Sequence, residues 1–113
     1  MTFDTYQEEA WETAIYPEKG QCSYLSLAYC ALGLSEAGEI QGKVKKYLRG
    51  DYGPLLTESV RSAILAELGD LLWYISAIAE ELGASLDEVA QKNIYKLRDR
   101  QQRGVIRGDG DNR

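Results

Sequence analysis

Two pairs of acidic residues have the types and the spacing that metal chemistry requires. Glu36 and Glu39 are three positions apart, and so are Glu67 and Asp70. Residues three apart share a face of an α-helix, so each pair would present two carboxylates side by side. Both pairs lie in apolar segments, where a carboxylate is costly unless it is paired or bound to a metal. Four such carboxylates on two antiparallel helices would form an oxygen-rich site suited to Mg²⁺ or Mn²⁺.

Each pair also has a more ordinary explanation. Glu-x-x-Glu and Glu-x-x-Asp patterns are common on solvated helix surfaces, and Lys43 can form an ion pair with Glu39 four positions before it. Two pairs within apolar segments are rarer than one. On the pattern alone, a metal site and a solvated surface remain equal alternatives.

The composition excludes several other chemistries. The 113 residues include no histidine, which excludes Ser-His and Cys-His nucleophiles and histidine-based metal sites. Cys22 and Cys30 are the only cysteines, and we expect them to be reduced core thiols, because two thiolates without histidine make a poor zinc site. The net charge of −5 argues against non-specific binding of nucleic acid. Any catalysis must therefore use carboxylates, Lys, Arg, Tyr, Asn and a bound metal.

Four helical segments must position these acids. They are predicted at roughly Phe3 to Ile15, Ser23 to Leu48, Thr57 to Leu82 and Ser85 to Arg103. Pro17, the turn cluster at 50–54 and Gly83 separate them, while Thr57 and Ser85 are the expected caps of the last two. No alternating β pattern of useful length is present. The sequence therefore predicts one all-α bundle over residues 1–103, followed by a glycine-rich tail at 104–113.

The third segment is apolar around most of its circumference. One broad face carries Leu65, Leu68, Leu71, Leu72, Ile75, Ala79 and Leu82, and the opposite side has little charge. A helix of this kind is usually buried on several sides, so we expect a homo-oligomer, with a central helix of a monomer as the alternative. No run of about 18 apolar residues predicts a membrane span. The N-terminus lacks the blocks of a signal peptide, and the cytoplasm is the expected location.

Four segments resemble those of a known enzyme family. The strings GLSEAGE at 33–39 and ELGDLLWY at 67–74 look like the two signatures of the MazG-like nucleotide pyrophosphohydrolases, of the all-α NTP pyrophosphatase superfamily. The stretch NIYKLRDR at 93–100 is similar to the family's Asn-x-x-Lys-Leu-x-x-Arg pattern, and the tail at 104–113 resembles its glycine-rich ending. The resemblance covers roughly residues 23 to 113.

The resemblance implies hydrolysis of a nucleoside triphosphate between its α and β phosphorus atoms, on a four-helix bundle completed by oligomerisation. Carried over by position, the Mg²⁺ ligands and catalytic residues would be Glu36, Glu39, Glu67 and Asp70. Glu36 or Glu39 would accept the proton of the attacking water. The substrate-binding residues would be Asn93, Lys96, Tyr74 and Arg100.

One position departs from the family pattern. Ser35 stands where many members have a glutamate before the first acid, which puts in doubt whether a further acid assists catalysis. Trp11, Tyr47 and Trp73 are candidates to stack on a base. Packing in the core or an interface is the more ordinary role of such residues, so the sequence assigns none of them to the base.

The expected substrates are nucleoside triphosphates, above all deoxynucleotides, with Mg²⁺ as the cofactor and Mn²⁺ as a possible substitute. The expected assembly is a homodimer or homotetramer, with no nucleic-acid or membrane partner. One alternative is a non-catalytic helical module that binds a nucleotide or a protein. Another is a related pyrophosphohydrolase acting on phosphoribosyl-ATP or guanosine tetraphosphate. Retention of all four acids favours an enzyme over a binding module.

Overall fold

The computed structural model describes residues 1–113, which form helices and loops without any β-strand. The five α-helices are α1 (Phe3–Glu12), α2 (Tyr24–Gly33), α3 (Glu36–Arg49), α4 (Glu58–Glu81) and α5 (Leu86–Gln102). The all-α class predicted from the sequence is confirmed. Beyond α5, the glycine-rich tail contains no helix.

The helix predicted from Ser23 to Leu48 is wrong at one point, because the structure divides it into α2 and α3. The break lies at Leu34 and Ser35, where backbone bonds of the tighter i→i+3 type replace the helical ladder, as in the 3.0 Å bond from Ser35 N–H to the Leu32 carbonyl. The other three predicted helices are present. Their ends differ from the prediction by at most three residues, the largest difference being at α1, which begins at Phe3 as predicted but ends at Glu12.

The ends of α4 and α5 follow the capping signals of the sequence. The Thr57 and Ser85 hydroxyls each accept a hydrogen bond from the backbone N–H three residues on, at 3.2 and 3.0 Å. At the other end of α4, Gly83 has a φ of +72°, which suits glycine. The Ala84 N–H donates to the Ala79 carbonyl at 2.9 Å, so α4 ends in a Schellman motif.

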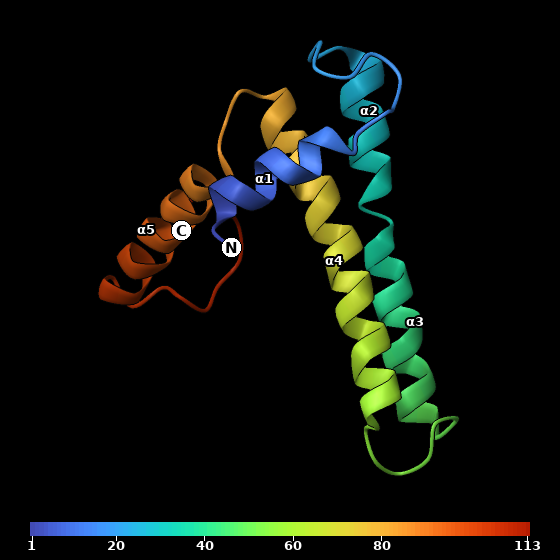
Figure 1. Cartoon of the computed structure of the whole chain (residues 1–113). Coiled ribbons are helices and arrows are strands. Elements are labelled where there is room, and N and C mark those ends of the chain that lie inside the picture. The colour runs from blue at the N-terminus through green and yellow to red at the C-terminus, as the bar shows by residue number, and fades with distance from the viewer.

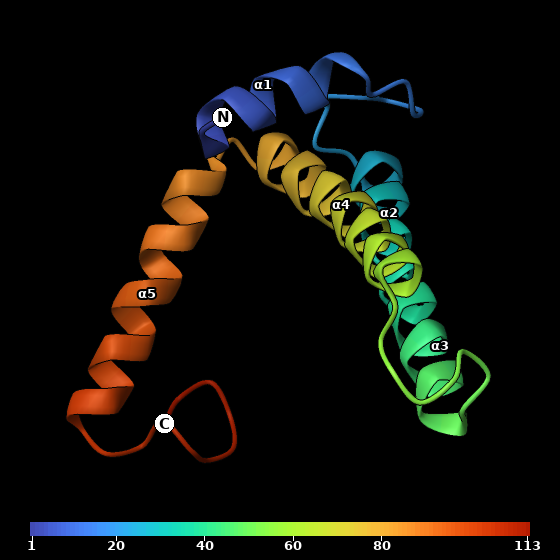
Figure 2. The same ribbon diagram turned by 60° about the horizontal axis from the view of Figure 1, so that its bottom comes forward.

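The helices form two arms that diverge from one end of the molecule (Figure 1). α3 and α4 run antiparallel and side by side, α2 continues the line of α3 along α4, and α1 crosses the far end of α4. α5 leaves that end in a different direction, as Figure 2 shows clearly. The small core, Ala14, Tyr16, Cys30 and Ala77, lies where the segment after α1 meets α2 and α4.

Gly33, the last residue of α2, permits a close approach between α2 and α4. A Cβ atom at this position would overlap the aromatic ring of Tyr74 on α4. The ring therefore packs directly against the α2 backbone, and a larger residue at position 33 would displace it. This contact also places the end of α2, and hence the start of α3, beside the middle of α4.

A buried carboxylate fixes the loop between α1 and α2. Glu81, which is 5% exposed, accepts hydrogen bonds from the Tyr16 hydroxyl at 2.6 Å and from the backbone N–H groups of Gly20 at 2.6 Å and Cys22 at 2.9 Å. Burial alone would raise the pKa of Glu81, but these hydrogen bonds outweigh it and lower the pKa. Burial and the bond to Glu81 raise the pKa of Tyr16.

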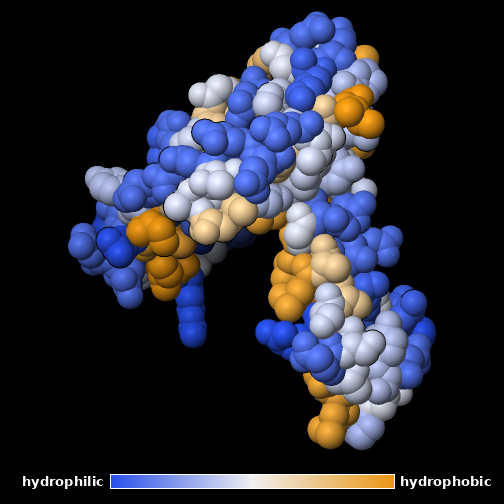
Figure 3. Space-filling view, in the orientation of Figure 1, coloured by the Kyte–Doolittle hydropathy of each residue, from blue (hydrophilic) through white to orange (hydrophobic).

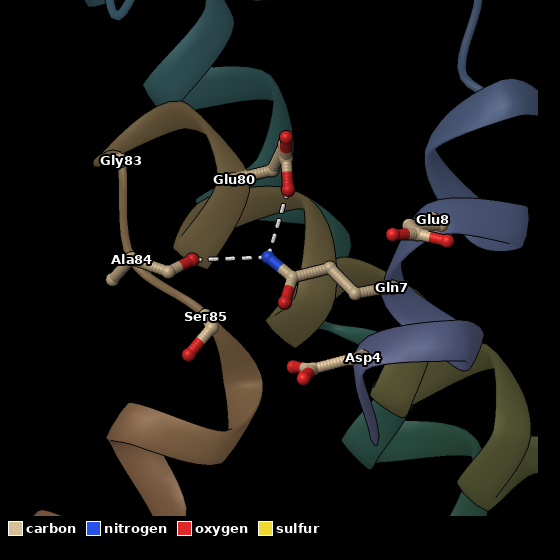
Figure 4. Close-up of a pocket in the computed structure, with 7 residues that line it drawn as sticks. All are labelled: Asp4, Gln7, Glu8, Glu80, Gly83, Ala84 and Ser85. Atoms are coloured by element: carbon tan, nitrogen blue, oxygen red, sulfur yellow. Dashed lines mark hydrogen bonds between the residues drawn. The ribbon is translucent and has the colours of Figure 1, made fainter. Parts of the chain in front are cut away.

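A buried amide joins α1 to the start of α5. The Gln7 side chain donates to the Glu80 carboxylate at 2.8 Å and to the Ala84 carbonyl at 2.9 Å, and its oxygen accepts from the Leu86 N–H at 2.8 Å. Figure 4 shows the bonds from Gln7 to Glu80 and Ala84 beside a polar cavity of about 410 Å³. All donors and acceptors of Gln7 are thus used in holding the helices together. None of the predicted site residues lines this cavity.

The single chain is open in shape. Its radius of gyration is 17.1 Å, whereas a compact domain of this length has about 13 Å. Its accessible surface is 8175 Å², compared with roughly 6,200 Å² for a folded monomer of this mass. Many large apolar side chains are among the exposed residues. Figure 3 shows orange patches along the inner edge and at the lower end of the α3–α4 arm, and another beside α5.

α4 is also long and apolar enough to cross a membrane if only its length and composition are considered. It has 24 residues and a mean hydropathy of 1.4 in its most apolar window, of which 17% is buried within the chain. A single helix that meets these criteria is weak evidence for a membrane span. Glu67 and Asp70 lie in the middle of this helix, where ionised carboxylates would be costly in a bilayer.

Candidate functional site

Three of the four predicted acids meet where α3 begins beside the middle of α4. Glu36 is the first residue of α3, and Glu67 and Asp70 are one turn apart on α4. One carboxylate oxygen from each of the three lies within 4.8 Å of the other two. Glu36 and Glu67 are half-buried, whereas Asp70 is exposed to solvent. The antiparallel pairing of α3 with α4 therefore brings carboxylates from the two helices together.

The charges of this group repel one another. Partial desolvation raises the pKa of Glu36, and the nearby Glu67, Asp70 and Glu39 carboxylates raise it further. A divalent cation would relieve this repulsion. The donors are all carboxylate oxygens, with no thiolate or imidazole among them, and this donor set fits Mg²⁺ or Mn²⁺.

Glu39, the fourth predicted ligand, lies outside this group of three. It is one turn further along α3 and is exposed. Its charge nevertheless reaches the group, since it contributes to the raised pKa of Glu36. The structure thus brings together three members of the predicted quartet and leaves Glu39 at its edge.

Lys43 belongs to this site, although the sequence placed it elsewhere. Its Nζ atom lies 3.5 Å from Oε1 of Glu67 on α4, and no ion pair with Glu39 is present. The ordinary alternative for Lys43, an i,i+4 pair within α3, is therefore not what the structure shows. Lys43 is seven residues, or two helical turns, after Glu36. That spacing places it on the same face of α3 and is the signal that could have identified it.

A cavity of about 290 Å³ adjoins the carboxylates. It is lined by Thr13, Glu36, Asp70, Trp73 and Tyr74. The structure thus places Tyr74 beside two of the acids, as predicted, and burial, the Tyr29 hydroxyl and the Glu36 charge raise its pKa. Thr13 was not identified from the sequence, because it lies in no motif and is brought to the cavity only by the packing of α1 on α4.

The predicted substrate-binding residues of α5 are not at this cavity. Asn93 and Lys96 are exposed on the diverging arm, and neither lines the cavity. Arg100 is 6% exposed, and its Nη2 atom donates to the Asp111 carbonyl at 3.2 Å. In a single chain, Arg100 therefore holds the C-terminal tail against α5.

Comparison with known proteins assigns most of the chain to one family. The model of the MazG nucleotide pyrophosphohydrolase domain matches residues 26–105, which include all four predicted acids. The chain is 48% identical over 115 aligned positions to "Gene 37 protein" of Mycobacterium phage L5, and the alignment covers 100% of both proteins. It is 29% identical over 93 positions to "Uncharacterized protein YvdC" of Bacillus subtilis strain 168, covering 79% of this chain and 88% of that protein. No solved structure matches.

Proposed function

The chain belongs to the MazG nucleotide pyrophosphohydrolase family, and on that premise we propose that it is a Mg²⁺-dependent enzyme that hydrolyses deoxynucleoside triphosphates to monophosphates and pyrophosphate. The observation that carries the proposal is the meeting of Glu36, Glu67 and Asp70 within 4.8 Å beside a cavity. A binding module would not need three mutually repelling carboxylates at this place.

The residues divide the work of such a reaction among them. Glu36, Glu67 and Asp70 would hold the metal, and Glu39, exposed one turn away, would turn toward it as the fourth ligand. When bound, Mg²⁺ supplies charge neutralisation for the triphosphate and lowers the pKa of a coordinated water. Either Glu36 or Glu39 would accept the proton of the attacking water.

Two further residues would position the substrate. Lys43, 3.5 Å from Glu67, offsets part of the acidic charge and would contact the departing phosphate oxygens. Tyr74 lines the cavity beside Glu36 and Asp70 and would lie against the nucleotide. Phosphoryl transfer depends mainly on positioning and charge stabilisation, so a site without histidine is sufficient.

Hydrolysis is tested by measuring pyrophosphate release from a panel of ribo- and deoxynucleoside triphosphates, with Mg²⁺ and with EDTA. We expect pyrophosphate with Mg²⁺ alone, and faster release from the deoxynucleotides. If the protein cleaves phosphoribosyl-ATP or guanosine tetraphosphate but none of these triphosphates, it is the related pyrophosphohydrolase named above as an alternative. Binding of nucleotide without cleavage of any substrate would contradict the enzyme and favour the binding module.

Metal binding by the carboxylate group predicts a change in thermal stability. Mg²⁺ at about 100 times its dissociation constant should stabilise the fold by about 2.7 kcal/mol, or roughly 10 °C in Tm. Asp70→Asn should remove most of this rise, whereas Glu58→Gln, in the exposed first turn of the same helix, should retain it. Differential scanning fluorimetry with and without EDTA measures both. An equal rise in the Asp70 variant would contradict the proposed ligand set.

We further propose that a second copy of the chain covers the exposed apolar face of α4. The chain exposes about 1,900 Å² more surface than a compact monomer of its mass. Burial of that area on each subunit falls within the size class of permanent interfaces, roughly 2,000–5,000 Å² in total. The side chains Leu65, Leu68, Ile75 and Leu82 are between 37% and 61% exposed along α4. A homodimer or homotetramer would bury them.

The same assembly would give Asn93 and Lys96 a role. α5 diverges from the α3–α4 arm of its own chain, so these residues would approach the carboxylate group of a neighbouring subunit. Sedimentation should give a multiple of 12.7 kDa. Mixing inactive Glu67→Gln with inactive Lys96→Ala, after partial denaturation and reassembly, should restore part of the activity. A stable 12.7 kDa monomer that is fully active would contradict both statements.

A further inference from the structure

The lining of the cavity beside the carboxylates has two chemically different parts. Glu36 and Asp70 form the acidic part, where a metal and phosphates would lie under the proposed function. Thr13 and Trp73, which are hydrogen-bonded to each other, form another part, and Trp73 is only partly buried. The volume of about 290 Å³ is just below the range of about 300–1,000 Å³ for small-molecule pockets. It would accommodate part of a nucleotide, with the rest extending over the exposed carboxylates.

The indole of Trp73 is held in one orientation by the segment after α1. Its Nε1–H donates to the Thr13 hydroxyl at 2.8 Å. That hydroxyl donates in turn to the Ala10 carbonyl at 2.7 Å. A hydroxyl has one proton to donate, so Thr13 can only accept from Trp73, and the direction of this hydrogen-bond chain is fixed. The Tyr16 ring meets the indole edge-on, with centroids 6.3 Å apart and an angle of 87°.

This support comes from outside the part of the chain that defines the family. The family match begins at residue 26, whereas Thr13 and Tyr16 precede it. Tyr16 is itself anchored by its 2.6 Å bond to the buried Glu81. Two interactions of the N-terminal segment, the Thr13 hydrogen bond and the Tyr16 ring contact, therefore converge on one aromatic side chain that lines the cavity. Packing alone explains a buried tryptophan, but Trp73 keeps part of its surface at the cavity.

Resting on the proposed function, we propose that Trp73 forms the wall against which the nucleoside part of the substrate packs, and that Thr13 is a positioning residue that holds this wall in place. The base stacks on the indole while the phosphates extend toward Glu36 and Asp70. Aromatic stacking is available to every base because each has a π-face. The N-terminal segment thus contributes nucleoside affinity, and the acidic group contributes the phosphate and metal chemistry.

The test measures binding separately from hydrolysis. Trp73 is the only tryptophan in a Trp11→Phe protein, so its fluorescence can be followed during titration with an α,β-methylene deoxynucleoside triphosphate and Mg²⁺. We expect quenching with this uncleavable nucleotide and little with inorganic triphosphate, which lacks a base. Calorimetric titration of the protein with native tryptophans, using the same two ligands, gives the affinities for comparison among variants.

Variants separate positioning from folding. Trp73→Leu and Thr13→Val should each weaken nucleotide binding, the first by roughly ten- to a hundredfold and the second by less, with unchanged affinity for inorganic triphosphate. Thr13→Ser retains the hydroxyl and should restore binding. In a Trp73→Leu background, Thr13→Val should have no further effect, because Thr13 acts through the indole.

Either of two results would overturn the inference. One is an equal loss of affinity for the nucleotide and for inorganic triphosphate in the variants. The other is a nucleotide affinity that neither Trp73→Leu nor Thr13→Val changes. Melting curves of all variants identify any that fail to fold, and Thr13→Ser then serves as the matched comparison. Hydrolysis that is independent of Thr13 and Trp73 would reject the inference and leave the enzyme intact. Base-dependent binding at Trp73 without hydrolysis would support the inference and reject the enzyme.

Discussion

Replacing Glu67 with glutamine is expected to reduce Mg²⁺-dependent pyrophosphate release by at least about a hundredfold, more than the ten- to hundredfold that loss of an outer partner of a metal ligand usually costs. Glu67 is the most connected acid of the site. It contributes an oxygen to the group of three, its charge raises the pKa of Glu36, and it forms the ion pair with Lys43. The variant keeps the shape of the side chain and removes its charge.

The same substitution should leave the metal-free fold intact. Removal of one of three negatively charged carboxylates reduces their mutual repulsion. The partly exposed ion pair with Lys43 contributes at most about 1 kcal/mol to stability. The Tm in EDTA should therefore be unchanged or slightly raised, which distinguishes lost chemistry from lost structure. Glu58→Gln on the same helix is the control and should remain active. If the activity of Glu67→Gln were close to that of the unaltered protein, Glu67 would not be a ligand of the metal.

Replacing Glu81 with glutamine is expected to lower the free energy of unfolding by about 3 kcal/mol, because hydrogen bonds to a charged group are worth about 1.5–3 kcal/mol each and a buried donor would be left unpaired. Both carboxylate oxygens of Glu81 accept hydrogen bonds, Oε2 from Tyr16 and Gly20 and Oε1 from Cys22. A glutamine amide would point its NH₂ group at one of these donors. The corresponding fall in Tm is roughly 10–20 °C. Tyr16→Phe, which removes a single donor, should cost about 1–2 kcal/mol.

The contribution of Glu81 should also depend on pH. Its pKa is lower in the folded protein than the ordinary value of 4.5. The stabilisation is therefore complete above the ordinary value and is lost as the pH falls through the lower, folded value. Urea unfolding of the native protein and of Glu81→Gln should differ most at pH 7 and converge in acid. A difference that is below about 0.5 kcal/mol at pH 7, or that grows in acid, would show that Glu81 does not hold the loop.

Much of the fold could be predicted because its signals are local. Thr57, Ser85 and Gly83 lie where capping rules place them, and the structure uses each as expected. The break between α2 and α3 could not be predicted in this way. It lies beside a tertiary contact, since Gly33 packs against Tyr74, a residue more than 40 positions away. No local window of the sequence contains that contact.

The candidate site was also only partly predictable from the sequence. Spacing of three predicts that Glu67 and Asp70 share one face of α4, because helix geometry fixes which residues lie side by side. Spacing alone left a metal site and a solvated surface as equal alternatives, and it was the family resemblance that joined Glu36 to these two acids. The contributions of Lys43 and Thr13 depend on how α3 and α1 cross α4, which spacing does not specify. In the single chain, α5 diverges from the α3–α4 arm. The resemblance therefore assigns Asn93 and Lys96 to a site that they do not line within one chain.

The identity of the products tests the central claim most directly. The purified protein is incubated with a deoxynucleoside triphosphate and Mg²⁺, and the products are followed by ³¹P NMR, with Glu67→Gln in parallel. We predict equal amounts of monophosphate and pyrophosphate, and neither product above background with the variant. Diphosphate with inorganic phosphate, or the same products at the same rate from the variant, would contradict a metal-assisted α–β cleavage at Glu36, Glu67 and Asp70.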